Sequence, residues 1–349
     1  MNPNFFDFSM ENRSLPINPH WIDKDDDRKN CKLITIDKKS NSIEKSSFSK
    51  IMDYIHPGDV IVLNNSRILA NAMILKNETH VVKFILHGFT PNGIVITPFF
   101  ADICCNSSYT LCGFPHVSIE IKEKNSDSSW NASISDPQAL VKYLSSNGER
   151  FDEYVSSRYF YTNRNAYEAV FASEYGSLDI PSAGIHFTND IIDEIKNKGA
   201  IVKFITLHVS TSEMALNRIV NTDNIEDFKI NPEYYDVPQE TADCINEAVK
   251  RGSRIFAIGT TVTRALESAF DHSSNKVVES KGWTTLYINP SYKIRVVDCL
   301  LTNLHQPKSS HMVLTAQFAG ADLLMQAYKS KEMDSMNFDL FGDCMLVLK

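Results

Sequence analysis

Three histidines beside small or polar residues are the first candidates for catalysis in this chain. His186 lies within the segment Pro181–Thr188, His208 follows an apolar run, and His305 lies in a polar turn. An imidazole can accept or donate a proton near neutral pH. Each histidine taken alone could equally be a hydrogen-bonded packing residue. The sequence therefore offers three candidates for a general acid or base without choosing among them.

A first substrate-binding candidate is the segment Pro181–Thr188, in which small residues precede an expected helix. The free backbone N–H groups at the start of a helix can bind a carboxylate or a phosphate. Gly184 could instead serve only as a turn. The binding residues predicted here are Ser182, Ala183, Gly184 and Thr188.

A second candidate is the segment Gly259–Ser268, where glycine and two threonines lead from a strand into a helix. Glycine allows a ligand to approach the backbone closely, and a threonine can cap the helix or donate to a ligand hydroxyl. Arg264 and Glu267 are three residues apart and could simply pair with each other. The segment lacks the G-x-G-x-x-G pattern, which disfavours a Rossmann methyltransferase or dehydrogenase. The predicted binding residues are Gly259, Thr260, Thr261 and Arg264.

A third candidate is the turn Leu300–Ser310, which places Asn303, His305 and Lys308 directly after an apolar run. Dense donors and acceptors at such a place are costly unless they bind a ligand or satisfy one another. Three shorter polar segments are weaker candidates, because each could be a turn or part of the core. They contribute the predicted binding residues Asn65, Arg67, Tyr234 and Asp343.

The elements that must position these residues alternate between helix and strand after residue 158. Such alternation predicts a layered α/β domain whose site lies at the carboxyl ends of its strands. The predicted helices are Thr188–Lys198, Pro238–Arg251 and Val262–Phe270. The predicted strands are Ile201–Leu207, Arg254–Ile258 and Ile294–Leu301, together with Lys32–Ile36 and Val60–Leu63 from the first 66 residues.

Residues 67–158 have a different sequence pattern, in which short β-branched runs are separated by Gly, Pro, Asn and Ser. Closely spaced short strands without long helices predict a small barrel or sandwich. We therefore expect an α/β fold in which a layered domain, residues 1–66 and 159–349, is interrupted by an inserted β-barrel domain, residues 67–158.

Composition narrows the classes of protein. The 349 residues are 43% hydrophobic, no apolar run approaches the length of a membrane span, and no signal-like start is visible, so we expect a cytoplasmic enzyme. Seven cysteines without C-x-x-C spacing or nearby histidines indicate reduced thiols and no zinc site. The formal net charge of −8 argues against non-specific coating of nucleic acid, although a local basic face could hold one RNA.

Six motifs in this order resemble the S-adenosylmethionine:tRNA ribosyltransferase-isomerases of queuosine biosynthesis, and the likeness extends over almost the whole chain. The family patterns P-T-A-G-L-H-F-T, T-L-H-V, E-Y-Y-x-V-P, G-T-T-x-x-R-x-L-E-S, L-L-T-N-x-H-x-P-K-S and G-D-x-M-L have close matches at Pro181–Thr188, Thr206–Val209, Glu233–Pro238, Gly259–Ser268, Leu300–Ser309 and Gly342–Leu346.

The resemblance implies a reaction that uses S-adenosylmethionine as a co-substrate, with no metal and no tightly held cofactor. Its ribosyl part is moved onto the aminomethyl group of 7-aminomethyl-7-deazaguanine in tRNA, so that epoxyqueuosine forms and adenine and methionine leave. The sulfonium acidifies the neighbouring C5′ protons, and one of the three histidines would remove one of them. Arg264 or Lys308 would hold the methionine carboxylate or a tRNA phosphate, while Asn303, Thr260 and Thr261 would orient ribose hydroxyls.

The chain departs from the family at some positions. Where the family continues G-L-G-T-F after the T-L-H-V motif, this chain reads Ser210–Met214, so two glycines are lost and the carboxylate of Glu213 appears. A paralogue that acts on a small-molecule amine or simply cleaves S-adenosylmethionine is therefore an alternative to the tRNA enzyme. A binding protein without activity is a third interpretation. The oligomeric state is not predicted.

Overall fold

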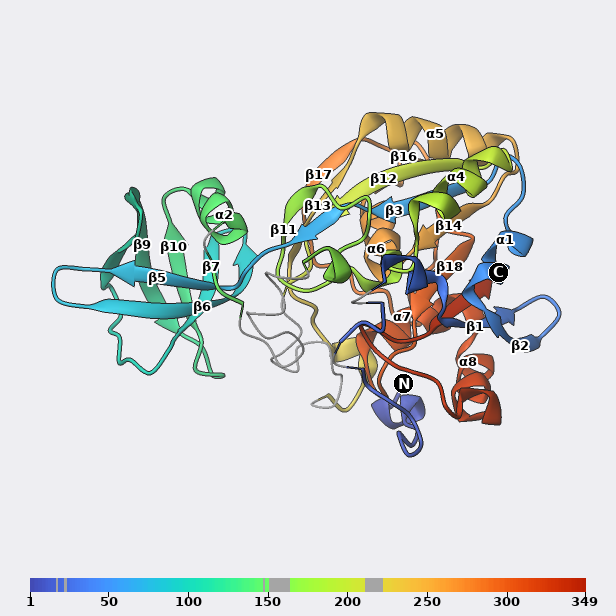
Figure 1. Ribbon diagram of the computed structural model, residues 1–349, viewed down its shortest axis with the longest axis horizontal. Helices are drawn as coiled ribbons and strands as arrows, with labels where there is room; N and C mark the ends of the chain where they lie inside the picture. The colour runs from blue at the N-terminus through green and yellow to red at the C-terminus, as the bar shows by residue number, and fades with distance from the viewer. Residues whose placement is uncertain (17, 22–23, 147, 151–163, 211–221) are drawn as a thin grey trace.

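A nine-stranded mixed sheet forms the centre of the larger of two lobes (Figure 1). The computed structural model describes residues 1–16, 18–21, 24–146, 148–150, 164–210 and 222–349. The strands of the sheet, in spatial order, are β17 (Ser280–Thr284), β13 (Glu233–Val237), β12 (Ile201–Leu207), β3 (Val60–Asn64), β14 (Ile255–Ile258), β18 (Cys299–Asn303), β19 (Cys344–Leu348), β1 (Lys32–Asp37) and β2 (Ser42–Ser47).

The middle of this sheet is parallel and covered on both faces. Strands β12, β3, β14 and β18 run parallel to one another, and every residue of β3 is buried. Val60 and Val62 of β3 belong to one apolar core, whereas Ile61 and Leu63 belong to a second core on the opposite face. This explains the continuous apolar run in the sequence, because parallel strands covered on both faces need apolar side chains in both directions.

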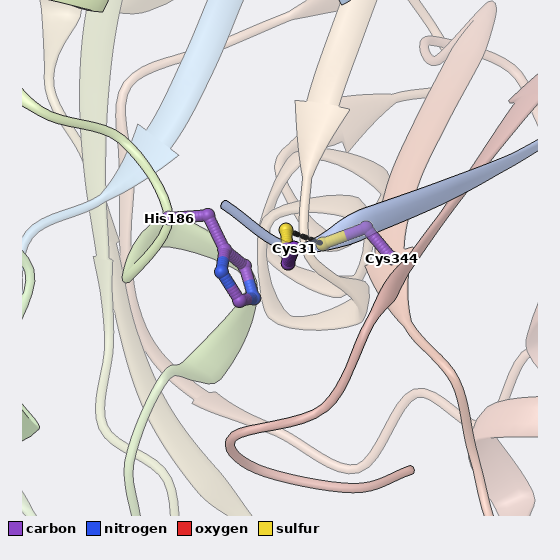
Figure 2. Close-up of side chains that lie close together, drawn as sticks. All are labelled: Cys31, His186 and Cys344. Atoms are coloured by element: carbon purple, nitrogen blue, oxygen red, sulfur yellow. Dashed lines mark hydrogen bonds between the residues drawn. The ribbon is translucent and has the colours of Figure 1, made fainter. Parts of the chain in front are cut away.

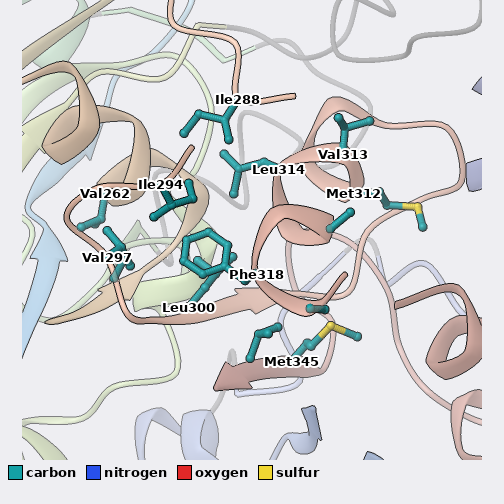
Figure 3. Close-up of a cluster of buried hydrophobic side chains, with 14 of the residues drawn as sticks. Val262, Ile288, Ile294, Val297, Leu300, Met312, Val313, Leu314, Phe318 and Met345 are labelled. Carbon is teal, nitrogen blue, oxygen red and sulfur yellow. The ribbon is translucent and has the colours of Figure 1, made fainter. Parts of the chain in front are cut away.

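Amphipathic helices complete the two cores. The first core, part of which is drawn in Figure 3, includes apolar side chains of α5 (Gln239–Lys250), α6 (Thr260–Ser268), α7 (Ser310–Ala319) and α8 (Ala321–Lys329). The second core includes side chains of α1 (Ile51–Tyr54) and α4 (Asn189–Asn197). None of the helices in the described part of the chain combines the length and hydropathy needed to cross a membrane.

The smaller lobe is a closed six-stranded barrel. In spatial order its strands are β10 (Trp130–Ile134), β7 (Gly93–Pro98), β6 (Val81–Thr90), β5 (Ala72–Lys76), β8 (Ser108–Leu111) and β9 (Phe114–Lys124), and pairing of β9 with β10 closes it. Apolar residues of α2 (Pro137–Ser146) join the barrel core. Closure leaves no unpaired strand edge, which stabilises so small a sheet.

The prediction of a layered α/β fold with an inserted β-barrel is confirmed by this architecture. A parallel pair of short strands, β4 (Ser66–Ile68) and β11 (Glu174–Ser177), lies between the two lobes (Figure 1). A second short pair is formed by β15 (Phe270–Asp271) and β16 (Lys276–Val277). The limits of 67–158 for the inserted domain stay a prediction, since residues 151–163 lie outside the described part.

The strand predicted at Ile294–Leu301 is wrong in its first half, because β18 begins only at Cys299. The carboxylate of Glu267 accepts hydrogen bonds from the backbone N–H groups of Arg295 at 2.9 Å and Val296 at 2.9 Å. These donors are therefore not available for a β-ladder. A side chain distant in sequence thus overrides a local apolar pattern that favoured a strand.

Candidate active site

The carboxyl ends of neighbouring parallel strands bring the predicted motifs together. Strand β3 lies between β12 and β14, and β18 follows β14 in the sheet. Since the four strands run parallel, the residues directly after them lie at one edge: Asn65 after β3, His208 after β12, Gly259 after β14 and His305 shortly after β18. This is the edge at which open α/β sheets bind ligands.

His208 is held by a chain of hydroxyl groups. Its Nδ1 lies 2.7 Å from the Ser66 Oγ, which lies 2.6 Å from the Ser177 Oγ, and Ser177 in turn accepts a hydrogen bond from the Val209 N–H at 2.9 Å. The ring of Tyr234 stacks on the imidazole with 5.9 Å between centroids and 20° between planes. Burial lowers the pKa of His208 to about 4. At neutral pH the ring is therefore uncharged and able to accept a proton.

Gly176 allows the His208 ring to occupy this position. A Cβ atom on Gly176 would lie 2.4 Å from both Cδ2 and Nε2 of the imidazole. This is far inside the normal contact distance of about 3.5 Å, so only glycine leaves room for the ring here. Gly176 was not among the residues predicted from the sequence. The available signal was a single glycine in a short β-strand, which often marks close approach of another group.

A cavity of about 370 Å³ opens beside His208 between the two lobes. Tyr234 and Trp283, whose rings meet edge to face with centroids 5.7 Å apart, line it from the α/β lobe. Its volume falls within the range of small-molecule sites, which are mostly apolar with a few polar groups. The remaining lining residues are Phe89, Pro137, Gln138, Val141, Tyr175, Gly176, Leu178, Val209 and Ser210.

A smaller cavity of about 30 Å³ adjoins the first, because Val209 lines both. Thr260, Thr261 and Arg264 of α6 line it together with Glu233. Thr260, Thr261 and Arg264 are binding residues that were predicted from the Gly259–Ser268 motif. Gly259 has a φ of 103° at the start of this helix, a conformation that favours glycine. The structure therefore brings the helix opening and the His208 strand end to two neighbouring cavities.

Arg264 and Glu233 form a buried ion pair at the wall of the small cavity. The Arg264 guanidinium donates to the Glu233 carboxylate and, through Nε, to the Leu286 carbonyl at 3.0 Å. The other Glu233 oxygen accepts from the Ser210 N–H at 3.0 Å. The alternative of an Arg264–Glu267 pair is wrong, since Glu267 is hydrogen-bonded to backbone instead.

The amide of Asn64 connects strands β3 and β12 to helix α6. Its Nδ2 donates to the Leu207 carbonyl at 2.9 Å and to the Thr261 Oγ1 at 3.2 Å, while its Oδ1 accepts from the Leu207 N–H at 3.0 Å. The predicted residue Asn65 accepts from the Thr206 hydroxyl at 2.7 Å. These bonds hold the backbone that presents His208 relative to the helix that lines the small cavity.

Arg67, also predicted as a binding residue, lies beside the large cavity rather than in its wall. Its Nε pairs with a Glu168 carboxylate oxygen at 2.8 Å. Its guanidinium lies 4.8 Å from the ring centroid of Tyr175, a lining residue of that cavity. Arg67 therefore supports a wall of the cavity through a cation–π contact.

His305 lies behind the small cavity, stacked on His311. The two ring centroids are 4.9 Å apart, and the His305 Nε2 lies 2.8 Å from the Thr302 Oγ1. Burial, followed by the neighbouring His311, lowers the pKa of His305 well below its usual value. The pKa of His311 is lowered to about 4 by burial and by Arg264. His311, which was not predicted from the sequence, lines the cavity itself.

His186 occupies a different place from the other two predicted histidines. Its ring is fully buried among Trp21 and Phe48, with centroid distances of 5.5 Å and 5.6 Å, and it lines neither cavity. The turn before it, η5 (Ser182–Gly184), packs closer to the site. A Cβ atom on Gly259 would lie 3.4 Å from the Cβ atom of Ala183. The motif thus supports the start of α6 while its histidine points into another core.

Four other predicted binding residues hold the fold together in the described structure. Thr188 caps α4 by accepting from the Ile191 N–H at 3.3 Å, and Asp343 accepts from the backbone N–H of Lys32 at 2.7 Å. The others are Lys308, which pairs with Asp7 at 2.8 Å, and Asn303, which donates to the Asp339 carbonyl at 2.9 Å. None of the four lines either of the two described cavities.

The altered segment Ser210–Met214 is described only at its first residue. Ser210 lines the large cavity, and its N–H binds Glu233. Glu213 lies outside the described residues, so its predicted influence on the second substrate stays a prediction.

Comparison with known proteins places the whole chain in one family. Residues 4–347 match the model of the family described as queuosine biosynthesis protein. The S-adenosylmethionine:tRNA ribosyltransferase-isomerase of Finegoldia magna is 30% identical, over 99% of this chain and 98% of that protein. The enzyme of the same name from Natranaerobius thermophilus is 33% identical, over 92% of this chain and 93% of that protein.

A solved structure shares the fold. The crystal structure of an S-adenosylmethionine tRNA ribosyltransferase from Thermotoga maritima matches with a TM-score of 0.54 and 23% identity, over 99% of this chain and 100% of that one. The sequence matches extend over both lobes and include every motif that leads to the two cavities. The chain therefore belongs to the queuosine biosynthesis protein family.

Proposed function

We propose that this chain is an S-adenosylmethionine:tRNA ribosyltransferase-isomerase. It transfers and isomerises the ribosyl part of S-adenosylmethionine onto 7-aminomethyl-7-deazaguanine in tRNA, giving epoxyqueuosine with release of adenine and methionine. The observation that carries the proposal is an uncharged histidine, His208, at the wall of a 370 Å³ cavity with aromatic sides. The names of two relatives that match along nearly their whole length support it.

His208 is the proposed base. In the tautomer with the proton on Nδ1, the imidazole donates to the Ser66 Oγ and leaves Nε2 with a free electron pair. A C5′ proton next to the sulfonium is unusually acidic, and transfer of this proton to Nε2 starts the loss of adenine. The lowered pKa keeps nearly all of the base unprotonated at neutral pH, although it also makes the base weaker.

The two cavities suggest how S-adenosylmethionine lies. The adenosine part fits the larger cavity against Tyr234 and Trp283, whose ring faces also attract the positive sulfonium. The methionine part then extends past Val209 towards Thr260 and Thr261, which supply hydroxyl donors at the start of α6. The Arg264 charge is already balanced by Glu233, so we assign it to positioning these walls rather than to carrying the carboxylate alone.

The acceptor base of tRNA reaches the same cavity in this proposal. A base that reacts must leave its stack, and aromatic side chains commonly receive such a base. The position of the cavity between the two lobes offers a route for it. No metal and no tightly held cofactor take part in the proposed reaction, and the cytoplasm, where tRNA is modified, is the proposed compartment.

The test combines S-adenosylmethionine and pure protein, with and without tRNA that carries the aminomethyl-deazaguanine. Mass spectrometry is used to measure free adenine and, after digestion of the tRNA, epoxyqueuosine. We expect both products only when this tRNA is present, and a rate that falls about 10²–10⁴-fold in His208→Ala, since this is the usual contribution of a general base. His272→Ala, at an exposed histidine, is the matched control and should keep the wild-type rate.

Other outcomes would lead to different conclusions. Adenine released equally without tRNA, and no modified nucleoside, would support cleavage or a small-molecule acceptor instead. S-adenosylhomocysteine as the product would indicate a methyltransferase. Binding of tRNA that does not weaken with rising salt would argue against the phosphate contacts that a tRNA enzyme requires.

A further inference from the structure

Three metal-binding side chains that are far apart in the sequence meet in the core of the α/β lobe (Figure 2). Cys31 precedes β1, Cys344 begins β19, and these strands are parallel neighbours. His186 reaches them from the turn after η5. The two Sγ atoms are 3.9 Å apart, and one ligand atom from each of the three residues lies within 4.8 Å of the others. The cluster is outside both cavities described above.

The distances match those around a tetrahedral zinc ion. Zinc binds thiolate sulfur at about 2.3 Å, so two such sulfurs lie about 3.8 Å apart across a tetrahedral angle. The observed separation of 3.9 Å between the Cys31 and Cys344 sulfurs needs almost no adjustment. The zinc–imidazole distance is about 2.0–2.1 Å, which places the nitrogen about 3.6 Å from each sulfur, and the three ligand atoms lie within 4.8 Å of one another without an ion.

His186 is oriented as a metal ligand. Its Nδ1 lies 3.3 Å from the Arg28 carbonyl, which leaves the buried Nε2 as the ring nitrogen for an ion. Histidines that bind metals usually donate their other ring N–H to a carbonyl or carboxylate in this way. The Cys31 thiol interacts with this ring, so the ring already faces one of the two sulfurs. Figure 2 shows the ring beside the two sulfurs.

The surrounding backbone is fixed by one carboxylate. Asp343, next to Cys344, accepts from the N–H of Lys32, next to Cys31, at 2.7 Å, and from the N–H of Asn337 at 2.8 Å. Asp343 therefore ties together the two segments that carry the sulfurs. Such an outer hydrogen bond holds the ligands in place before an ion binds.

We propose that Cys31, His186 and Cys344 bind a zinc ion. Two thiolates balance its charge and the imidazole is neutral, so the buried site carries no net charge, which a dry core requires. Thiolate and imidazole ligands together favour zinc among the common ions. The described residues provide three of the ligands that a tetrahedral zinc site uses. The ion joins the start of β1, the start of β19 and the Pro181–Thr188 segment, and its role is to stabilise the fold.

This proposal revises the expectation of no zinc site. That expectation relied on C-x-x-C spacing and on histidines near cysteines in sequence. Here each ligand comes from a different segment, and only the packing of β1 against β19 brings the cysteines together.

Metal analysis of the full-length protein tests the proposal. Protein is produced with zinc in the medium, purified without chelator and analysed by inductively coupled plasma mass spectrometry. We expect one zinc ion per chain in the wild type and a zinc content about tenfold or more lower in Cys344→Ala. Cys299→Ala is the matched control, because Cys299 lies buried in the same apolar core, away from the cluster, and should retain the zinc.

Cobalt substitution of the wild type keeps the test decisive if Cys344→Ala fails to fold. Tetrahedral cobalt bound to thiolates gives intense visible bands and a sulfur charge-transfer band, and we expect both. Wild-type protein that binds neither zinc nor cobalt after reconstitution would overturn the proposal. So would zinc retained fully in folded Cys344→Ala, or a Cys31–Cys344 disulfide found in peptides of the freshly purified protein.

Discussion

Replacing Gly176 by alanine is expected to displace the His208 ring and slow the proposed reaction. The added Cβ would lie 2.4 Å from the ring, whereas ordinary carbon contacts begin near 3.5 Å, so the imidazole must move by about 1 Å. The ring can make this shift only by lengthening its bond to Ser66 or by leaving its stack on Tyr234.

A displacement of about 1 Å at a reacting group costs about 10²-fold in rate, which corresponds to about 2.7 kcal/mol in the activation barrier. Crowding of a packed site costs a further 1–3 kcal/mol or so in the free energy of unfolding. We would measure adenine release in the presence of the modified tRNA, together with urea denaturation. Gly88→Ala is the matched control, because its Cβ would meet only the Ser210 side chain, at ordinary contact distances of 3.5 Å to Oγ and 3.9 Å to Cβ.

A double-mutant cycle separates loss of ring placement from general damage. In a His208→Ala background there is no ring to displace, so adding Gly176→Ala should change the residual rate very little. A wild-type rate in folded Gly176→Ala would contradict this prediction. So would a Gly176→Ala substitution that slows the His208→Ala variant as strongly as it slows the wild type.

Two further predictions concern pH and the buried ion pair. Because burial lowers the pKa of His208 to about 4, the acid limb of kcat/KM should fall near pH 4, and a limb near pH 6.5 would exclude this histidine as the base. The unfolded chain takes up this proton first, so the free energy of unfolding should decrease as pH falls from about 6.5 to about 4, measured by urea denaturation. Glu233→Gln leaves the Arg264 charge buried and should lower the free energy of unfolding by about 3–5 kcal/mol. The control is Glu247→Gln at the exposed pair with Arg251, which should lower it by less than about 1 kcal/mol. Equal losses in the two variants would contradict the value given for Glu233→Gln.

Local patterns in the sequence determined most of the elements. Strand β12 was predicted with its observed bounds, Ile201–Leu207, and helix α4 begins at Asn189, one residue after the predicted start at Thr188. Apolar periodicity and capping act over a few residues, so they can be identified without knowledge of the fold. The meeting of the motifs at one edge of the sheet could also be predicted, because the carboxyl ends of parallel strands lie at the same edge.

The tertiary structure alone decided which partners these residues have. Arg264 of α6 pairs with Glu233 of β13 rather than with Glu267 on its own helix, and Gly176 of β11 makes room for the His208 ring, which follows β12. His186 has its motif at the edge of the site but its ring beside two cysteines in the core. The sequence showed the histidines that could act as acid or base and the polar residues that could bind a substrate. Their distances depend on packing between segments far apart in the chain, which no local pattern records.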